Sequence, residues 1–339
     1  MRRVGFLLLP EFSSLGLAAA IEPLFVANWL AQRPVFEWTT ISVDGRPVRA
    51  SNGTQTTVDA DLSAADFASV FVLASFEPLA AARHSEALRW LKRLARTGVE
   101  LGGIENGSWM LARAGLLNDH DVSVHWDNLA GFQEAFPACR ATSQLYCRSR
   151  NRITCAGASA ILDLMIAFMG WLGEGDLAAE VADHLLLTRV RPPHTEQRQG
   201  LETAREGVDR VVAKAARLMA AHLEEPLSCR QIAQRVGLSL RQIERRFAQE
   251  LNSTVLQHYR QVRVAKAHQL LQQTTLSVID VAVACGFSSP EYFSRVYRRQ
   301  FGCLPSRDRQ QSTTAPVLRR PRNRRESDAN EQAPRGRES

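Results

Sequence analysis

Two segments in the C-terminal half of the sequence place arginines on one face of an expected helix. The segments are residues 227–252 and 276–302, and each ends in apolar residues spaced three or four apart with basic residues between them. Such spacing gives a helix one buried and one charged face. Guanidinium groups bind phosphate oxygens and can hydrogen-bond to guanine at two points. The pattern therefore predicts a polyanion-binding surface, although a solvated side chain is the alternative for any single arginine.

The two segments also share the residue order of a helix-turn-helix unit. In each, a Ser with a polar residue three positions later is expected to cap a first helix. A Gly then allows a turn with positive φ, and a later Ser can cap the second helix. The corresponding residues are Ser228 and Ser277, Gly237 and Gly286, and Ser239 and Ser288. A helix-like segment, residues 255–271, joins the units, and its length of about 25 Å would place two recognition helices about one DNA turn apart.

This basic region resembles the AraC/XylS-type DNA-binding domain. The matching positions are Ile232-Ala233, Gly237-Leu238-Ser239, Arg245, Phe247, Arg263, Ala267, Val281-Ala282, Gly286-Phe287, Tyr292-Phe293, Phe301-Gly302 and Pro305-Ser306. The resemblance implies an all-α domain of tandem helix-turn-helix units that binds double-stranded operator DNA. Asn252 stands where the family has Gly, a minor departure because Asn tolerates the left-handed conformation.

Position along the expected recognition helices assigns roles to their polar side chains, because residues early on such a helix contact base edges. The candidates for base contacts are Leu240, Arg241, Glu244 and Arg245 in the first unit and Ser289, Glu291, Ser294 and Arg295 in the second. The candidates for phosphate contacts are Arg246, Arg263, Lys266, Arg298 and Arg299. The apolar stripes on the opposite faces are expected to be core: Ile243, Phe247 and Leu251, then Phe293, Tyr297 and Phe301.

The N-terminal half alternates expected strands and helices. Strands are predicted at residues 4–9, 36–43, 70–74 and 99–104, and helices at residues 14–31, 84–97 and 108–114. Continuous apolar strands in this alternation predict a parallel sheet covered by helices on both faces. Asn52-Gly53 marks a hairpin at residues 48–58. Further strands are expected at residues 123–125, 144–148 and 152–155, and the last helices at residues 158–171 and 176–187.

One turn, residues 102–108 with the sequence GGIENGS, lies between a buried strand and a helix. Folds of the α/β class place a nucleophile at such a turn, above the helix N-terminus. The turn resembles the class I glutamine amidotransferase-like fold of the DJ-1/PfpI group, as it is fused to AraC-type modules in GlxA-like regulators. Further matches are Glu22-Pro23-Leu24, Ala27-Asn28, the helix end at residues 112–117, His125-Trp126, residues 153–157 and Asp163-Leu164. The resemblance implies an α/β flavodoxin-like N-terminal domain.

The turn departs from the enzymes of this fold, which place Cys where this sequence has Glu105. A carboxylate at a helix N-terminus is expected to be stabilised as the anion, and it is a poor substitute for a thiolate. Cys155 is expected to be a small buried apolar residue. The sequence therefore favours a sensor domain without catalytic residues, cofactor or metal over an amidase or hydrolase of the same fold.

The candidate ligand site combines negative charge with aromatic rings, which suits a cation. Glu22 and Glu105 would supply the carboxylates. Phe76, Trp109 and Trp126, with Phe12, would supply the rings, and Asn28, Ser75, Asn106 and His125 would hold a polar tail. The resemblance implies arginine or a quaternary amine, such as glycine betaine or carnitine, as the effector. The alternative is that Glu22 bonds to the elbow backbone and the aromatic residues are core.

Charge and composition place these features in two domains of one chain of 339 residues. Residues 1–204 carry 18 Lys and Arg against 22 Asp and Glu, and residues 205–310 carry 17 against 9, which is typical of a polyanion-binding module joined to another domain. The six cysteines lack CxxC spacing, and no apolar stretch approaches the roughly 20 residues that span a bilayer, so a cytoplasmic protein with reduced thiols is expected.

The expected organisation is a sensing domain at residues 1–190, a linker at 191–206, a DNA-binding domain at 207–308 and a disordered basic tail at 309–339. The expected partners are an operator, a small effector and a second copy bound through the N-terminal domain, with RNA polymerase if the protein activates a catabolic operon and with no membrane.

Overall fold

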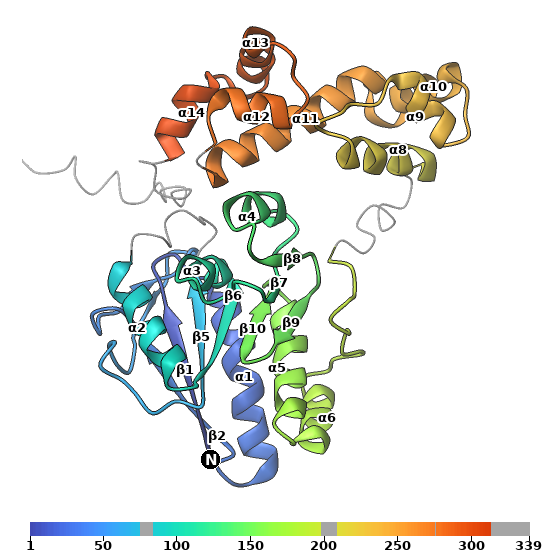
Figure 1. Ribbon diagram of the computed structural model, residues 1–339. Helices are drawn as coiled ribbons and strands as arrows, with labels where there is room; N and C mark the ends of the chain where they lie inside the picture. Colours follow the sequence, from blue (N-terminus) through green and yellow to red (C-terminus); the bar gives the residue numbers. More distant parts are fainter. Residues whose placement is uncertain (75–83, 198–208, 275, 313–339) are drawn as a thin grey trace, which may run out of the picture.

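The computed structural model describes residues 1–74, 84–197, 209–274 and 276–312 (Figure 1). Within these residues the chain forms an N-terminal α/β part and a C-terminal part made of helices. The fold class expected from the sequence is confirmed for both parts.

A sheet in the order β2-β1-β5-β6-β10-β9 forms the centre of the N-terminal part. Its strands are β1 (Arg2–Leu8), β2 (Phe36–Ile41), β5 (Ser69–Ala74), β6 (Glu100–Glu105), β9 (Tyr146–Ser149) and β10 (Arg152–Cys155). All neighbours pair in parallel except β9, which pairs antiparallel with β10. Because the strands are parallel, their carboxyl ends lie along one edge, and the turn after β6 lies there.

Helices cover both faces of this sheet, as the continuous apolar strands predicted. One face packs against α1 (Ser14–Ala31), α5 (Ala160–Trp171) and α6 (Gly175–His184), with Phe6, Phe71 and Ile153 in the shared core. The other face packs against α2 (Ser85–Arg96), α3 (Gly107–Arg113) and α4 (Leu129–Ala135), with Leu7, Val72 and Trp109 in the shared core. The strand residues therefore alternate between two cores.

Several local features differ from the sequence expectations. The hairpin strands are short, β3 (Val48–Arg49) and β4 (Gln55–Thr56). The strand expected at residues 123–125 is β7 (Asp121–Ser123), which pairs with β8 (Arg140–Thr142) in a separate two-stranded sheet. The sequence did not predict β8 or α4.

The start of the expected linker is packed on the N-terminal part. Arg191 donates hydrogen bonds from its backbone and guanidinium to the buried Asp163 carboxylate, at 2.6–2.9 Å. Gln197 donates to the carbonyl oxygen of Val124 at 2.9 Å. Arg191 and Gln197, which were expected in the linker, are therefore hydrogen-bonded to the N-terminal part.

The C-terminal part contains two helix-turn-helix units joined by one long helix (Figure 1). The first unit consists of α9 (Cys229–Arg235) and α10 (Leu240–Leu251), and α8 (Arg210–Ala221) packs against it. The second consists of α12 (Val278–Ala284) and α13 (Pro290–Phe301), and α14 (Pro305–Ser312) follows. The joining helix α11 (Val255–Gln273) has 19 residues, a length of about 28 Å.

The helix caps agree with the expected repeat except at one position. Ser228, Ser239 and Ser277 each form a capping box with the residue three positions later. In the second unit Ser289, and not Ser288, caps α13, because Pro290 occupies the first helical position and shifts the start by one residue. The turn glycines Gly237 and Gly286 have φ of 80° and 70°.

Two further expectations need correction. Residues 309–312, which were expected in the tail, belong to α14, and the rest of the expected tail lies outside the described residues. Helix α1 is 18 residues long and apolar enough to cross a membrane by composition, which the sequence reasoning overlooked. In the structure this helix packs on the sheet beside α5 and α6, with Ala20, Leu24 and Ala27 fully buried.

Candidate functional site

The turn at the end of β6, called the elbow here and comprising residues 105–107, has a strained backbone. Glu105 has φ of 55°, a left-handed conformation that costs a non-glycine residue free energy. Gly107 is required by close packing, because a Cβ there would lie 2.0 Å from the carbonyl oxygen of Val72. The structure thus confirms a strand-turn-helix with the shape of a nucleophile elbow and a carboxyl group at its apex.

The Glu105 carboxyl group lies against the loop after β10. Its Oε1 accepts a hydrogen bond from the backbone N–H of Ala158 at 3.5 Å. Gly157 leaves room for the side chain, since a Cβ at that position would lie 2.2 Å from Cγ of Glu105. Burial raises the pKa of Glu105 to about 7, and hydrogen bonds from Ala158 and Ser13 offset only part of this effect. The expectation of a stabilised anion is therefore wrong, because desolvation outweighs the interactions that favour the charge.

Glu22 and Asn28 lie away from the elbow, contrary to the sequence expectation. Ser13, which caps the start of α1, contacts Glu105, and Glu22 is exposed on the same helix about 13 Å farther along. The Asn28 amide accepts hydrogen bonds from the backbone of Val35 and Phe36 at 2.8 and 2.9 Å. Asn28 therefore closes the α1–β2 connection at the opposite end of the sheet and has a structural role.

Asn106 connects the elbow to the segment before α4. Its buried side-chain oxygen accepts a hydrogen bond from Asn128 Nδ2 at 2.9 Å. His125 lies three residues before Asn128, and its Nδ1 accepts from the backbone of Asp127 at 3.3 Å. Burial lowers the pKa of His125, which favours the neutral imidazole. The structure thus places the expected residues Glu105, Asn106 and His125 on the elbow and on the turn bonded to it.

The aromatic candidates divide between core and surface. Trp109 is buried and packs edge-on to Phe132 and Phe136, at 5.3 and 5.4 Å between ring centroids. Its Nε1 has no hydrogen-bond partner within the part of the chain that the structure describes. Phe12 is core, and Trp126 is 42% exposed. Ser75 and Phe76 lie outside the described residues.

Three residues near the elbow were missed by the sequence reasoning: Ser13, Asn128 and Ala158. Ser13 stands immediately before the expected helix at residue 14 and has the signature of an N-cap. Ala158 follows a Gly in a matched motif. Asn128 had no sequence signal, because α4 was not predicted.

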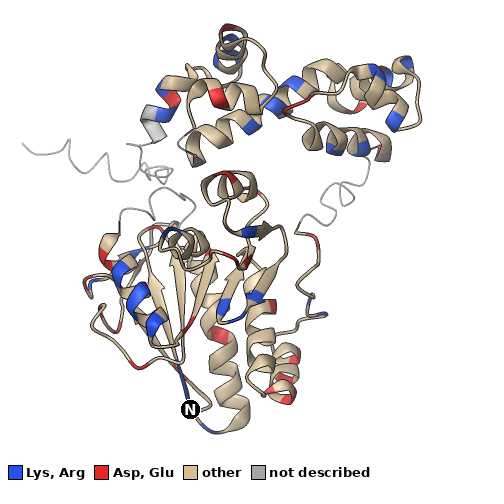
Figure 2. Ribbon diagram, viewed as in Figure 1, with Lys and Arg blue, Asp and Glu red and all other residues tan. Residues whose placement is uncertain are grey.

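The recognition helices expose part of the predicted DNA-binding set. On α10, Arg241 and Arg245 are exposed and Leu240 is 41% exposed. On α13, Glu291, Arg295, Arg298 and Arg299 are exposed. Basic residues occur along α8, α10, α11 and α13, whereas α6 in the N-terminal part carries acidic ones (Figure 2). The two recognition helices α10 and α13 lie apart and both contact α11 (Figure 1).

Two candidates on α10 have intramolecular partners. Glu244 accepts a hydrogen bond from the backbone N–H of Val255, at the start of α11, at 3.1 Å. Arg246 forms an ion pair with Asp209, the cap residue of α8. These contacts join α10 to its neighbouring helices and favour positioning roles, while the expected base and phosphate contacts stay predictions.

The candidates on α11 also have structural partners. Arg263 donates to the carbonyl oxygens of Cys285 and Gly286, and its guanidinium lies 4.2 Å from the Phe287 ring centroid. Lys266 donates to the side chain of Gln269 at 2.8 Å, and burial lowers its pKa. These contacts favour a structural role for Arg263 and Lys266, and the expected phosphate contacts of both residues stay predictions.

Two serines in the second unit differ in position from the expectation. Ser289 accepts from the backbone N–H of Tyr292 as the cap of α13 and donates to Glu291 at 2.6 Å. Ser294 is half-buried. Neither serine has the exposure of the arginines on the same helix.

Comparison with known proteins agrees with both parts of the structure. The DJ-1/PfpI family matches residues 2–170, and a helix-turn-helix domain matches residues 232–311. The chain is 41% identical to the HTH-type transcriptional regulator CdhR of Pseudomonas aeruginosa over 90% of each chain. It is 39% identical to GbdR of that species over 94% of this chain and 87% of that one, and 34% identical to GlxA of Rhizobium meliloti over 92% and 97%. The chain belongs to the GlxA-like transcription regulators of the AraC family.

A solved structure supports the N-terminal fold of this GlxA-like regulator. An AraC family transcriptional regulator from Pseudomonas putida is 30% identical, with a TM-score of 0.51, and covers 55% of this chain and 100% of its own. A ThiJ/PfpI family protein from Pseudomonas syringae, 22% identical with a TM-score of 0.50 over 57% of this chain and 78% of its own, shows the same fold. The relatives named above are transcriptional regulators, in agreement with a DNA-binding regulator.

The thiols of the regulator's N-terminal part do not resemble a nucleophile. Cys155 is fully buried, and burial raises its pKa to about 12. A thiol with such a pKa is not a thiolate at neutral pH. Among the described residues no group of three His, Cys, Asp or Glu side chains is arranged to hold a metal ion.

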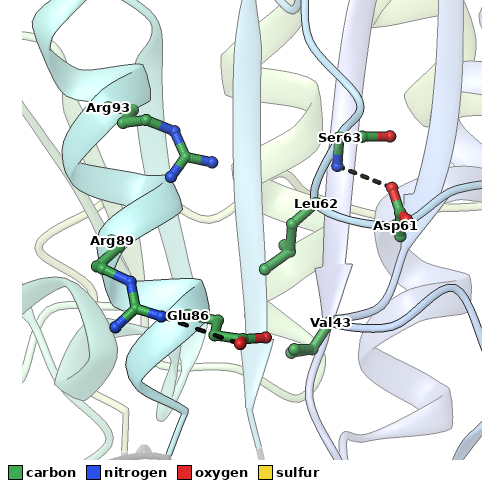
Figure 3. Close-up of a pocket in the computed structure, with 7 residues that line it drawn as sticks. All are labelled: Val43, Asp61, Leu62, Ser63, Glu86, Arg89 and Arg93. Carbon is green, nitrogen blue, oxygen red and sulfur yellow. Dashed lines mark hydrogen bonds and ion pairs between the residues drawn. The ribbon is translucent and has the colours of Figure 1, made fainter.

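A depression of about 250 Å³ lies elsewhere on the N-terminal part, between α2 and the segments after β2 (Figure 3). Its lining is polar: Arg89 lies 3.9 Å from Glu86, and the Ser63 backbone donates to Asp61 at 2.8 Å. None of its lining residues belongs to the elbow. The depression is therefore separate from the elbow.

Proposed function

We propose that this regulator senses a small cationic effector at the Glu105 elbow and thereby controls a catabolic operon as an activator. The observation that carries the proposal is the largely buried carboxyl group at the strained elbow, with Asn106 and His125 on adjoining segments. Strain retained at such a position is characteristic of functional sites. The cationic class covers arginine and quaternary amines such as glycine betaine and carnitine.

The raised pKa of Glu105 gives cation binding a specific pH signature. A bound cation favours the ionised carboxyl group, so binding releases a proton when Glu105 is protonated beforehand. Below pH 7 the affinity is expected to fall by about tenfold for each pH unit. A ligand without a cationic group would lack this dependence. The second candidate function, an amidase or hydrolase of the DJ-1/PfpI fold, is disfavoured by the buried, protonated Cys155.

Calorimetry of the full chain against glycine betaine, carnitine, arginine and matched neutral and anionic compounds tests the effector class. The proposal expects heat with a cation at pH 8, weaker binding of the same compound at pH 6, and loss of binding in Glu105→Gln. The Glu180→Gln variant is the matched control, because Glu180 is an exposed carboxylate on α6 and is not part of the elbow. Heat only with an anionic or sugar ligand would exclude the cationic class.

We further propose that α10 and α13 of one subunit enter successive major grooves of the operator, held apart by α11. Replacing Arg245 with Ala is expected to weaken operator binding by about 1–3 kcal/mol and to relax specificity at one base position. A mobility-shift series over single-base operator variants measures both effects. Lys214→Ala removes an exposed charge from α8 as the control, and equal effects of the two variants would remove Arg245 from the base contacts.

We propose that the regulator forms a homodimer through the exposed face of α1. Leu15, Phe25 and Trp29 are 62%, 52% and 53% exposed, and Glu22 is the only charged residue of the helix. The stripe extends over about 21 Å. In a two-fold dimer the same patch of each subunit packs against its copy, so this apolar stripe can pack against the α1 stripe of a second copy. Such a dimer would bind an operator that has two half-sites.

Phe25→Asp is expected to convert the dimer to a monomer in sedimentation equilibrium. The control is Leu186→Asp, which adds the same charge at a residue that is 86% exposed and lies beyond α6. A chain that is monomeric before substitution, or a dimer that tolerates Phe25→Asp, contradicts the interface.

In the proposed cellular setting the dimer acts in the cytoplasm and contacts RNA polymerase when it activates.

A further inference from the structure

A direct hydrogen bond joins the N-terminal part to the long helix of the DNA-binding part. Gln269 of α11 donates from Nε2 to Asp127 Oδ1 at 2.7 Å, and its Oε1 accepts from Lys266 at 2.8 Å. The amide is therefore fixed at both ends. Helix α4 lies next to α11 beside this bond (Figure 1).

The residue that follows Asp127 is bonded to the elbow. Asn128 donates to the buried Asn106 side chain at 2.9 Å, and Asn106 follows Glu105 directly. The turn of residues 125–128 is closed internally, because the Asn128 backbone donates to the His125 carbonyl oxygen at 2.8 Å and the Asp127 backbone donates to His125 Nδ1. Adjacent residues of one compact turn thus contact the elbow and α11.

Helix α11 contributes to the cores of both helix-turn-helix units. Val255 and Tyr259 near its start pack with α9 and α10, and Val264 and Ala267 pack with α12 and α13. Gln269 lies within the second of these stretches. A displacement of residues 125–128 would therefore act on the helix that sets the positions of both recognition helices.

We propose that the turn at residues 125–128 is the coupling element that transmits occupancy of the elbow to the DNA-binding part, through Asn106–Asn128 on one side and Asp127–Gln269 on the other. Asn128, Asp127 and Gln269 are positioning residues that contact neither operator nor effector. The functional arm of the proposal rests on the proposed effector site. Because coupling between two sites is reciprocal, operator binding must also alter the elbow.

The structural arm is tested without any ligand by hydrogen exchange of the full chain. Gln269→Ala is expected to speed exchange of amides in residues 106–113 and 125–135 by about fivefold, the effect of losing one typical hydrogen bond, because Asp127 is exposed to solvent. Gln261→Ala, an exposed glutamine on the same helix, is the control and should leave these amides unchanged. Asn128→Ala should in turn speed exchange in residues 264–272.

A double variant separates coupling from simple domain packing. If both hydrogen bonds belong to one coupling path, the double variant Asn128→Ala with Gln269→Ala should speed exchange at residues 106–113 no more than the single variant with the larger effect. Additive changes, or changes confined to α11, would overturn the proposal.

The functional arm uses operator fragments selected from random DNA and glycine betaine as the probe. The proposal expects betaine to change operator affinity of the unsubstituted chain by about 5–150-fold and Gln269→Ala to reduce that factor toward one, with betaine affinity retained. A betaine effect that survives in Gln269→Ala contradicts the coupling. No betaine effect on the unsubstituted chain counts against the proposed effector, and the exchange measurements then decide the coupling by themselves.

Discussion

Replacing Glu105 with Gln is expected to stabilise the N-terminal part at pH 8 by up to about 3 kcal/mol and to have little effect near pH 4. In the unfolded chain the carboxyl group ionises near pH 4.5, and in the folded chain burial raises its pKa to about 7. Between these values the folded state retains a proton that the unfolded state has lost. The free energy of unfolding therefore falls as pH rises through this window, and the loss is complete above pH 7.

Gln preserves the size of the side chain and an oxygen that accepts from Ala158, but it cannot ionise. The variant should therefore lack the fall in stability between pH 4.5 and 7. The partial exposure of the carboxyl group makes 3 kcal/mol an upper limit. The native sequence keeps Glu105 although its burial lowers the free energy of unfolding. This agrees with a carboxyl group that serves binding and not stability.

Urea unfolding followed by tryptophan fluorescence measures this effect in the intact chain. All six tryptophans precede residue 172, so the signal reports the N-terminal part and not the helix-turn-helix units. Glu180→Gln on α6 serves as the control for removing an exposed carboxylate. Parallel pH profiles for the Glu105→Gln variant and the unsubstituted chain would show that burial of Glu105 does not set the pH dependence.

The sequence predicted the elements that rest on local patterns. The helix at residues 14–31, the strand at 152–155 and the capping boxes at Ser228 and Ser277 have the expected positions. Each depends on residues within a few positions of one another, and apolar periodicity or a cap defines it. The elbow followed from the same logic, since a glycine-rich turn between a buried strand and a helix is a local signal.

The roles that the sequence did not predict depend on partners from distant segments. Arg246 pairs with Asp209 in α8, and Glu244 bonds to the backbone of Val255 in α11. A charged residue on a helix looks the same in the sequence whether its side chain faces solvent or bonds to a neighbouring helix. Glu22 was misplaced for the same reason: Ser13 contacts Glu105 across the fold, and Glu22 lies about 13 Å farther along α1.

Replacing Arg263 with Ala is expected to destabilise the second helix-turn-helix unit by about 3 kcal/mol. The guanidinium donates to two backbone carbonyl oxygens at the turn between α12 and α13 and stacks over Phe287. Hydrogen bonds from a charged donor contribute about 1.5–3 kcal/mol each, and their loss leaves the Cys285 and Gly286 oxygens without this partner. The turn is tight, since a Cβ on Gly286 would lie 2.4 Å from the carbonyl oxygen of Leu223.

Two measurements together distinguish this structural role from the phosphate contact that the sequence suggested. Hydrogen exchange of residues 278–301 should become about a hundredfold faster in Arg263→Ala, while the salt dependence of operator binding keeps its slope at a temperature where the unit remains folded. Arg299 is exposed on α13, and Arg299→Ala should have the opposite effects. Hydrogen exchange should stay unchanged, and the slope of the log binding constant against log salt concentration should fall in magnitude by about one. If Arg263→Ala lowers the slope and leaves exchange unaltered, Arg263 binds phosphate. The expected outcome instead makes this arginine the residue that holds the second recognition helix in position through the turn that precedes it.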